Sequence, residues 1–282
     1  MYLNVEVTSL LLILANFLVS LQGFNQMEFR QRYHFRVDRV IGGREYHRLF
    51  TSGFLHSGWS HLIFNMLALY LFAPALDALG VSVGAFLLLY ISALVGGNLV
   101  ALGLHRNHGD YSALGASGAV NGVIFAAIAL MPSLKVWFMP GWLFGIMYLL
   151  ATIYGIKAQY GRVSHESHLG GALVGIFVAT ALNPSILFAH PLVIMAMVLP
   201  AAGFLFLVYT RPESMMIPNY LQYEMSRVKE TIGRSPSTRL QTQKDAFTSP
   251  EEEIDHLLDK GIENLTKKEK KRLEELSRSL NG

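Results

Sequence analysis

Long apolar runs dominate the first 210 residues of this chain. A membrane-spanning helix needs about 20 mostly apolar residues, because each backbone polar group must find its partner without water. The predicted spans are residues 5–24, 59–79, 83–104, 116–131, 136–156, 168–182 and 192–209. We therefore expect an all-α polytopic membrane protein. The shortness of the fourth and sixth spans predicts helices that begin below the membrane surface, beside a cavity.

The charge of the chain supports this class. Only 15% of the residues are charged, and 26 of these 43 residues follow Tyr209. Soluble domains carry roughly 25% charged residues, so the first 210 residues do not resemble one. The run at 5–24 has no basic segment before it and no small-residue cleavage site, which favours a retained membrane helix over a signal peptide. The expected location is an integral multi-pass position in a bacterial cell (inner) membrane.

Composition also excludes several kinds of chemistry. The chain has no cysteine, which rules out disulfides, cysteine-ligated zinc and a cysteine nucleophile. The net charge of +3 is small, and no basic or aromatic nucleic-acid motif is present, so we expect no nucleic-acid partner.

Two polar regions flank the spans. The segment 25–57 is too long for a simple connector and predicts a structured interfacial element. It contains Arg30, Arg32, Arg36, Arg39, Arg44 and Arg48. The predicted domains are a membrane core at 1–189, an extra transmembrane helix at 190–210, a polar linker at 211–250 and a short helical tail at 251–282. Capping boxes at Ser249 to Glu252 and at Thr266 to Glu269 predict helix starts in the tail, which could bind an unidentified protein partner.

Polar residues of catalytic type interrupt three of the apolar runs. His56-x4-His61-x3-Asn65 enters the second run, and His61 and Asn65 share a helical face because they are four residues apart. His56 is five residues from His61, so we expect it in the preceding loop. Ionisable groups at membrane depth are costly and face a protein interior or a cavity. By itself, each of these residues is also explained as polar contact between helices.

A serine and a second histidine open the fourth and sixth runs. Ser117 follows Gly115, whose freedom permits a tight turn, and a helix start there leaves the Ser117 N–H open to a developing oxyanion. His168 is a suitable base to take a serine proton. An ordinary helix cap explains Ser117 alone, and a satisfied interfacial histidine explains His168 alone.

The glycines beside these residues predict how the two helices meet. Gly118 and Gly122 form one small-xxx-small pair, and Gly171 and Gly175 form another. Such pairs let helix backbones approach closely in lipid. Packing of one pair against the other would bring Ser117 near His168.

Together these motifs resemble the rhomboid family of intramembrane serine proteases over roughly residues 1–185. The resemblance implies a six-helix core, and the seventh span resembles the extra C-terminal helix of one branch of the family. The small helical soluble tail is predicted from its own sequence. The resemblance makes Ser117 the nucleophile and His168 the general base of a dyad. It makes His61, Asn65 and the Ser117 N–H the oxyanion hole, with no metal and no cofactor. The supporting motif residues are His56, Gly115, Gly118, Gly171, Gly175 and Arg48. The implied substrates are single-pass transmembrane proteins in the lipid bilayer.

Two positions depart from the family pattern. Tyr46-His47-Arg48 supplies an arginine without the usual preceding tryptophan. Asn121 stands where the family often has an aromatic residue, and its amide could orient His168 by a hydrogen bond.

Other functions remain open at this point. A catalytically inactive rhomboid-like protein that binds membrane clients would have the same fold. A membrane metalloprotease or metal transporter would use His56, His61, His165 and His168, but His165-Glu166-Ser167-His168 is one residue short of the zinc-protease signature. Orientation is also in conflict. The arginine-rich first loop favours a cytoplasmic face near Ser117, whereas the resemblance places the opening of the active site outside.

Overall fold

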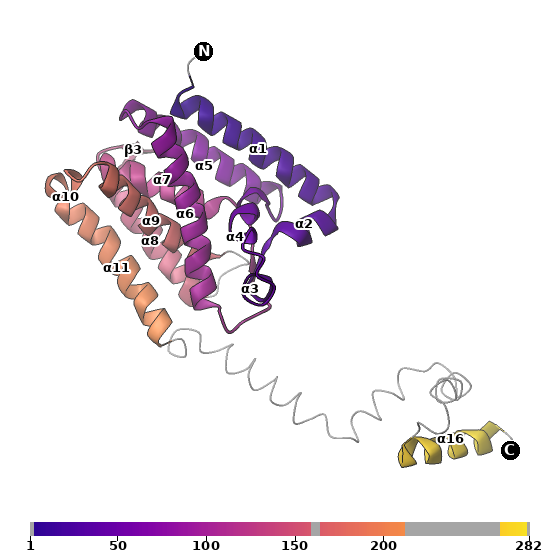
Figure 1. Ribbon diagram of the computed structural model, residues 1–282. Helices are drawn as coiled ribbons and strands as arrows, with labels where there is room; N and C mark the ends of the chain where they lie inside the picture. Colours follow the sequence, from indigo (N-terminus) through magenta and orange to yellow (C-terminus); the bar gives the residue numbers. More distant parts are fainter. Residues whose placement is uncertain (1–2, 159–163, 212–265, 281–282) are drawn as a thin grey trace. The chain divides into compact units, whose positions relative to one another are not determined.

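The computed structural model describes residues 3–158, 164–211 and 266–280 of the chain. The chain divides into two units, Met1–Met216 and Ile217–Gly282. The long helices of the first unit are α1 (Val5–Asn25), α5 (Trp59–Ala78), α6 (Val83–Leu104), α7 (Ser117–Leu130), α8 (Gly141–Ala158), α9 (His165–Leu182) and α11 (Pro191–Thr210), as Figure 1 shows. Its short elements are α2 (Met27–Tyr33), β1 (Phe35–Arg36), α3 (Val37–Ile41), α4 (Arg48–Thr51), η1 (Ser52–Phe54), β2 (Ser112–Ala113), β3 (Lys135–Val136), β4 (Met139–Pro140) and α10 (Ile186–Ala189).

Each predicted span corresponds to one long helix of this unit. By length and composition, α1, α5, α6 and α11 are able to cross a membrane, and α7 and α8 are shorter apolar helices. The expectation of an all-α membrane protein is therefore confirmed. The short fourth run becomes α7, and the sixth becomes α9, which starts three residues earlier than predicted, at His165.

The predicted start of the fifth span is wrong. Residues 135–140 form an antiparallel hairpin of β3 and β4 instead of the first turn of a helix. Trp137 at the tip of this hairpin has a φ of +55°, in the left-handed region, which a right-handed α-helix does not allow. Helix α8 begins only after Pro140.

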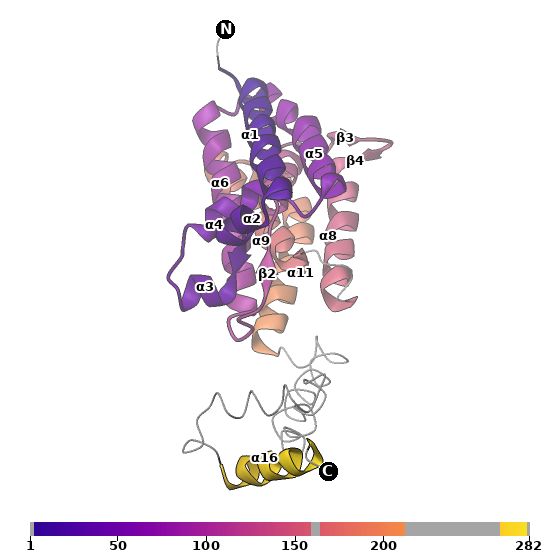
Figure 2. The ribbon, with the colours of Figure 1, turned by 90° about the vertical axis from the view of Figure 1, so that its right-hand side faces the viewer.

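The first loop is structured, as its length predicted. Its strand β1 pairs with β2, which lies just before Ser117, so that Phe35 faces Ala113 and Arg36 faces Ser112. Figure 2 shows α2 and α4 beside the middle of the unit and α3 and β2 below them, whereas β3 and β4 lie near its top. The pairing of β1 with β2 therefore places the first loop beside the segment that leads to α7.

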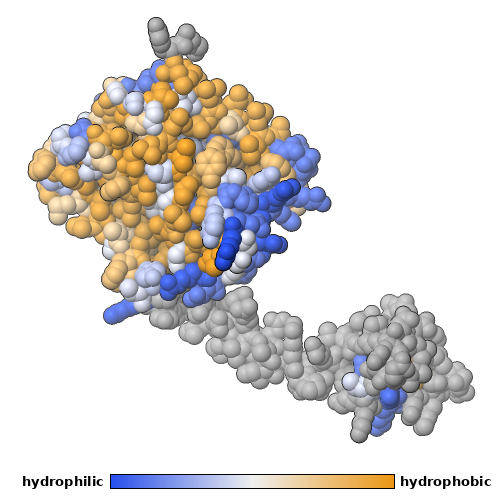
Figure 3. Space-filling view, in the orientation of Figure 1, coloured by the Kyte–Doolittle hydropathy of each residue, from blue (hydrophilic) through white to orange (hydrophobic). Residues whose placement is uncertain are grey.

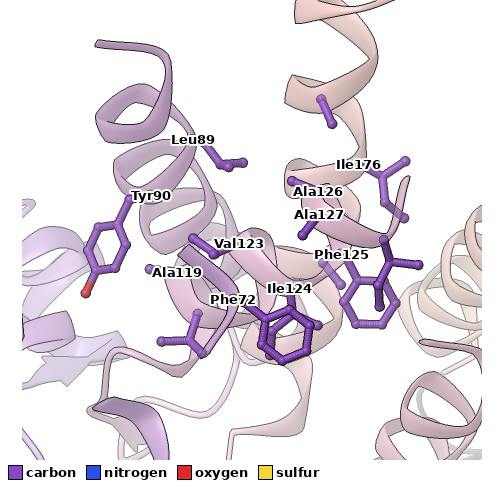
Figure 4. Packing of buried hydrophobic residues seen from close by; sticks show 14 of the residues in the cluster. Phe72, Leu89, Tyr90, Ala119, Val123, Ile124, Phe125, Ala126, Ala127 and Ile176 are labelled. Carbon is purple, nitrogen blue, oxygen red and sulfur yellow. The ribbon is translucent and has the colours of Figure 1, made fainter. Parts of the chain in front are cut away.

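Helix α7 is the buried centre of the unit. Every residue from Gly118 to Ala129 is buried, as expected for a helix that is apolar on all sides. Figure 4 shows side chains of α7 packed between Phe72 of α5, Leu89 and Tyr90 of α6, and Ile176 of α9. Helix α7 therefore contacts α5, α6, α8 and α9.

Glycines allow α7 and α9 to touch through their backbones. A Cβ atom built on Gly171 would lie 3.0 Å from the Cα of Gly118 and still closer to its carbonyl oxygen. One turn further, a Cβ on Gly175 would lie 2.6 Å from the Cα of Gly122. The predicted packing of the two glycine pairs is confirmed.

The outer surface of the unit is apolar. Figure 3 shows hydrophobic residues over most of the visible face, and hydrophilic residues gathered over the first loop. Large exposed side chains on the long helices include Leu14, Phe64, Leu88, Tyr154 and Phe206. A surface of this kind fits a lipid environment, and α9 is partly shielded from it by its neighbours α8 and α11 (Figure 1).

The tail unit contains helix α16 (Lys267–Leu280). The Thr266 hydroxyl donates to Glu269 Oε2 at 2.6 Å, and the Glu269 N–H donates to Thr266 Oγ1 at 3.3 Å. The second predicted capping box is therefore confirmed. The predicted linker 211–250 and the capping box at Ser249 lie outside the described residues, apart from Arg211 at the end of α11.

The glycine contact between α7 and α9 leads to a stability prediction. Gly171→Ala should lower the free energy of unfolding by about 2 kcal/mol, because the added methyl meets the backbone of Gly118. Gly103→Ala is the matched control, since a Cβ at Gly103 in α6 meets nothing within 4 Å. Denaturant unfolding in detergent micelles measures both variants. Equal stabilities for the two variants would contradict the close packing.

Candidate active site

A cavity of about 660 Å³ opens within the first unit, lined by α5, α7, α8, α9 and the β3–β4 hairpin. Its polar lining residues are Ser57, Ser60, His61, Asn65, Ser117, Asn121, Tyr148 and His168. Apolar side chains such as Phe64, Leu71 and Phe144 make up most of the remaining wall. The residues predicted as dyad and oxyanion hole therefore share one cavity, although they come from three helices.

Ser117 is the first residue of α7, directly after a sharp turn. Gly115 in this turn has a φ of +133°, a conformation that favours glycine. A Cβ there would also lie 2.6 Å from Cε1 of His61. The Gly115 N–H donates to the carbonyl oxygen of Ser52 at 3.0 Å, which holds the turn against the first loop. Ser117 thus stands at a helix N-terminus whose free N–H groups can stabilise negative charge.

His168 lies in the first turn of α9 and lines the same cavity as Ser117. Its Nε2 atom is buried and has no hydrogen-bond partner among the described residues. Buried ring nitrogens are normally paired, so this atom is available to a group that enters the cavity. The glycine contact of α7 and α9 explains why His168 and Ser117 reach the same space.

His61 and Asn65 extend along α5 on one side of the cavity. The Ser57 hydroxyl lies 3.1 Å from His61 Nδ1. If it donates there, the neutral imidazole carries its proton on Nε2, which lies close to the turn at Gly115. The Asn65 amide donates one hydrogen bond to the His61 carbonyl oxygen at 2.9 Å and keeps a second N–H.

His56 lies in the loop before α5, as predicted, and it contacts the segment that leads to Ser117. Its Nε2 accepts the N–H of Ala116 at 3.4 Å, and its Nδ1 lies 2.8 Å from the Ser20 hydroxyl. Ser20 in turn donates to the Phe54 carbonyl oxygen at 3.0 Å. These bonds require a neutral ring protonated on Nδ1. Burial, and to a lesser degree the nearby His61, lowers the pKa of His56 to about 3.

Asn121 lines the cavity one turn after Ser117. Its amide donates to the Ser117 carbonyl oxygen at 2.8 Å. No hydrogen bond between Asn121 and His168 is found in the described part of the chain. Its predicted role in orienting His168 stays a prediction.

Arg48 is buried and organises the first loop, away from the cavity. Its Nη1 donates to the carbonyl oxygens of Gln31 and His34, each at 2.8 Å, and its Nε is paired with Glu45 at 2.5 Å. The arginine therefore holds the structured element in place without the usual tryptophan before it. These contacts with Gln31, His34 and Glu45 give Arg48 a structural role in the first loop.

The sequence did not point to Ser20, Ser52 or Ser57, which hold His56, Gly115 and His61. Ser57 had one possible signal, since it precedes His61 by four residues. Ser20 is 36 residues from His56 and carries no local signal. A second cavity of about 160 Å³, lined in part by Ser57, Ser112 and Ser164, also reaches Ser117 and His61.

Metal ligation was the other chemistry considered for the histidines. The ring centroids of His56 and His61 are 5.0 Å apart, and those of His165 and His168 are 5.7 Å apart. Within the described ranges, no three histidine or carboxylate side chains are grouped to hold a metal ion. The ring contacts join His56 with His61 and His165 with His168, while His61 and His168 both line the large cavity.

Comparison with known proteins decides the family. The family model of the Rhomboid domain matches residues 43–185, about half of the chain. The chain belongs to the rhomboid family. A family of unknown function, DUF6576, matches residues 248–279 in the tail. The rhomboid match ends just after α9, so α11 and the tail lie beyond it.

Several curated rhomboid relatives are similar to this chain. Rhomboid protease GluP of Bacillus subtilis (strain 168) is 29% identical over 61% of this chain and 33% of its own length. RHOMBOID-like protein 12, mitochondrial, of Arabidopsis thaliana is 29% identical over 60% of this chain and 55% of its own length. Rhomboid protein 1, mitochondrial, of Saccharomyces cerevisiae (strain ATCC 204508 / S288c) is 31% identical over 44% and 38%. The matches span between a third and just over half of these relatives.

These comparisons make the chain an integral membrane protein with the fold of a rhomboid protease or rhomboid-like protein. Rhomboids act on transmembrane substrates within the bilayer. The relatives include mitochondrial and chloroplastic proteins, so family membership does not select a bacterial membrane.

The turn before Ser117 gives a testable consequence. Gly115→Ala should slow covalent labelling of Ser117 by a fluorophosphonate about a hundredfold, because the new methyl displaces the His61 ring. Gly80→Ala is the control, since Gly80 also has a positive φ, of +73°, but a Cβ there meets nothing within 4 Å. Similar labelling rates for both variants would exclude a role for the Gly115–His61 contact.

The buried His56 predicts a pH-dependent stability. Its pKa is about 3 in the folded chain and near 6.5 when unfolded, so the unfolded chain binds more protons between these values. The stabilising effect of the neutral ring is complete above pH 6.5 and is lost as the pH falls towards 3. Thermal unfolding between about pH 7.5 and about pH 4.5 should therefore show a smaller loss for His56→Gln than for the wild type. Parallel curves would contradict this account.

Proposed function

We propose that this chain is an intramembrane serine endopeptidase that cleaves transmembrane segments with a Ser117–His168 dyad. The observation that supports the proposal is the shared cavity, which is lined by Ser117 at a helix N-terminus and by His168, whose Nε2 has no hydrogen-bond partner among the described residues. His61 and Asn65 line the same cavity. Membership of the rhomboid family supports the same reaction.

The reaction begins at the Ser117 hydroxyl. His168 Nε2 takes the hydroxyl proton while Ser117 Oγ forms a bond to the carbonyl carbon of the scissile peptide. The carbonyl oxygen becomes an oxyanion, which His61, Asn65 and the Ser117 N–H stabilise by hydrogen bonds. The imidazolium of His168 then donates its proton to the leaving amine, and the peptide C–N bond breaks.

Water completes the cycle. His168 takes a proton from water, whose oxygen attacks the acyl carbon, and the proton returns to Ser117 Oγ as the ester breaks. The smaller cavity is lined by His61 and by serines that include Ser117, besides Ala113 and Leu114, and these hydroxyls fit a store of such water. The dyad needs no carboxylate, metal or cofactor for this sequence of steps.

The cavity also fits the substrate class. Its wall is mainly apolar and extends from Ser57 to Trp137, as a transmembrane segment would require. A helix hides its carbonyls in hydrogen bonds, so the segment must unwind before Ser117 can attack. We therefore propose single-pass transmembrane proteins with helix-weakening residues near the cleavage site as substrates.

Several finer predictions belong to this proposal. A bacterial cell (inner) membrane remains the predicted location, and the tail remains a predicted partner-binding module. The described residues of the tail offer a capped helix for such contact.

A catalytically inactive rhomboid-like protein is the second candidate, since some relatives are named only as rhomboid-like. The preserved set of Ser117, His168, His61 and Asn65 favours activity. Reaction of Ser117 with a fluorophosphonate separates the two candidates, because an inactive protein would not activate the serine.

Ser117→Ala should reduce cleavage of a reporter transmembrane substrate by at least about 10³-fold, since it removes the nucleophile. His168→Ala should have a similar effect. Ser92→Ala in α6 is the matched control, because its half-buried hydroxyl bonds only to the carbonyl oxygens of Leu88 and Leu89 in its own helix, among the described residues. The assay uses purified protein in lipid vesicles. Cleavage by Ser117→Ala at the wild-type rate would overturn the assignment.

A further inference from the structure

A buried polar cluster lies beside the dyad and has no part in the proposed chemistry. Glu166 Oε1 in the first turn of α9 lies 3.4 Å from His105 Nε2 at the end of α6. The His105 ring stacks on Tyr111, with ring centroids 3.7 Å apart and an interplanar angle of 8°. The Tyr111 hydroxyl is 2.6 Å from the Ser164 hydroxyl and donates to Glu166 Oε2 at 3.4 Å. The cluster thus joins the segment 105–116 to the start of α9.

Glu166 needs a partner at this position. The side chains of Glu166 and His105 are only 13% and 8% exposed, and a buried carboxylate without a partner is strongly destabilising. The groups that face the carboxylate are His105 from α6, Tyr111 from the connecting segment and His165 from its own helix. A carboxylate is also favourable at a helix N-terminus.

Hydrogen bonds lead from this cluster towards the serine. The Ser164 hydroxyl is 2.8 Å from that of Ser167, which donates to Asn98 Oδ1 at 3.4 Å. The Asn98 amide donates to Ser52 Oγ at 3.1 Å. The Ser52 carbonyl oxygen accepts the N–H of Gly115, two residues before Ser117.

The cluster also includes a residue of α9, the helix that carries His168. Glu166 and His168 belong to the same helical turn, and Tyr111 directly precedes Ser112 of β2. The cluster therefore connects the segment that leads to the serine with the helix that carries the histidine. The glycine contact sets how far apart α7 and α9 lie, but it does not hold the segment 105–116.

We propose that Glu166 and His105 are positioning residues, whose pair holds the segment 105–116 on the first turn of α9 and thereby sets the geometry of Ser117 and His168. The inference rests on the proposed function. It assigns no direct contact with the substrate to either residue, because neither lines the large cavity.

The test compares Glu166→Gln, His105→Gln and the double variant with the wild type in lipid vesicles. The Glu166→Gln change keeps the size of the side chain but removes its charge. Each protein is measured for kcat and KM on a reporter transmembrane substrate, for the rate of fluorophosphonate labelling and for thermal unfolding. Glu28→Gln, in the exposed first turn of α2, is the matched control.

We expect kcat and the labelling rate to fall about ten- to a hundredfold in each single variant, with KM within about twofold of the wild type. The double variant should lose no more than the single variants, because both remove the same pair. Tyr111→Phe removes only the hydroxyl and should give a smaller loss in the same direction. It also serves as the second test if Glu166→Gln does not fold.

Three results would overturn the proposal. They are a wild-type kcat in Glu166→Gln, losses in the single variants that add up in the double variant, and a loss of kcat that only follows the loss of folded protein. Failure of the proposed function is seen separately, since Ser117→Ala would then cleave at the wild-type rate whatever the effect at Glu166.

Discussion

The backbone contact between α7 and α9 is the interaction on which the candidate site depends. Glycines at 118, 122, 171 and 175 remove the side chains that would keep the helices apart, so carbonyl oxygens of one helix meet Cα atoms of the other. Apolar side chains gain little from association in lipid, which makes close packing of this kind a main source of helix affinity. The same contact brings Ser117 and His168, from two separate helices, to one cavity.

Polar groups around this contact are held by bonds that come from far along the chain. His56 links α1, through Ser20, to the N–H of Ala116. Ser52 and Asn98 link the first loop and α6 to the same region. Each bond satisfies a buried polar group, and unsatisfied groups are costly at such sites. The turn before Ser117 is thus fixed from several sides before any substrate enters.

Much of the architecture was predictable because a membrane-spanning helix depends on a continuous run of apolar residues, which the sequence shows directly. The ends of α6 and α11 were predicted within one residue, and the capping box at Thr266 was predicted correctly. The exception is informative. Residues 135–140 are apolar enough for a helix, yet they form a hairpin in which Trp137 is 80% exposed. Hydrophobicity does not distinguish a helix from a hairpin, because the pairing of residues 135–140 depends on the backbone conformation of the turn at Trp137.

The sequence by itself determined the class of the protein, its long apolar helices except for the start of α8, and the motifs around Ser117, His168, His61 and Asn65. These features are local, since each depends on residues a few positions apart. Only the tertiary structure decided which groups hold those motifs. The partners of His56 and Glu166, Ser20 and His105, lie 36 and 61 residues away along the chain. Pairing over such distances follows from how the helices pack, which local sequence patterns do not contain.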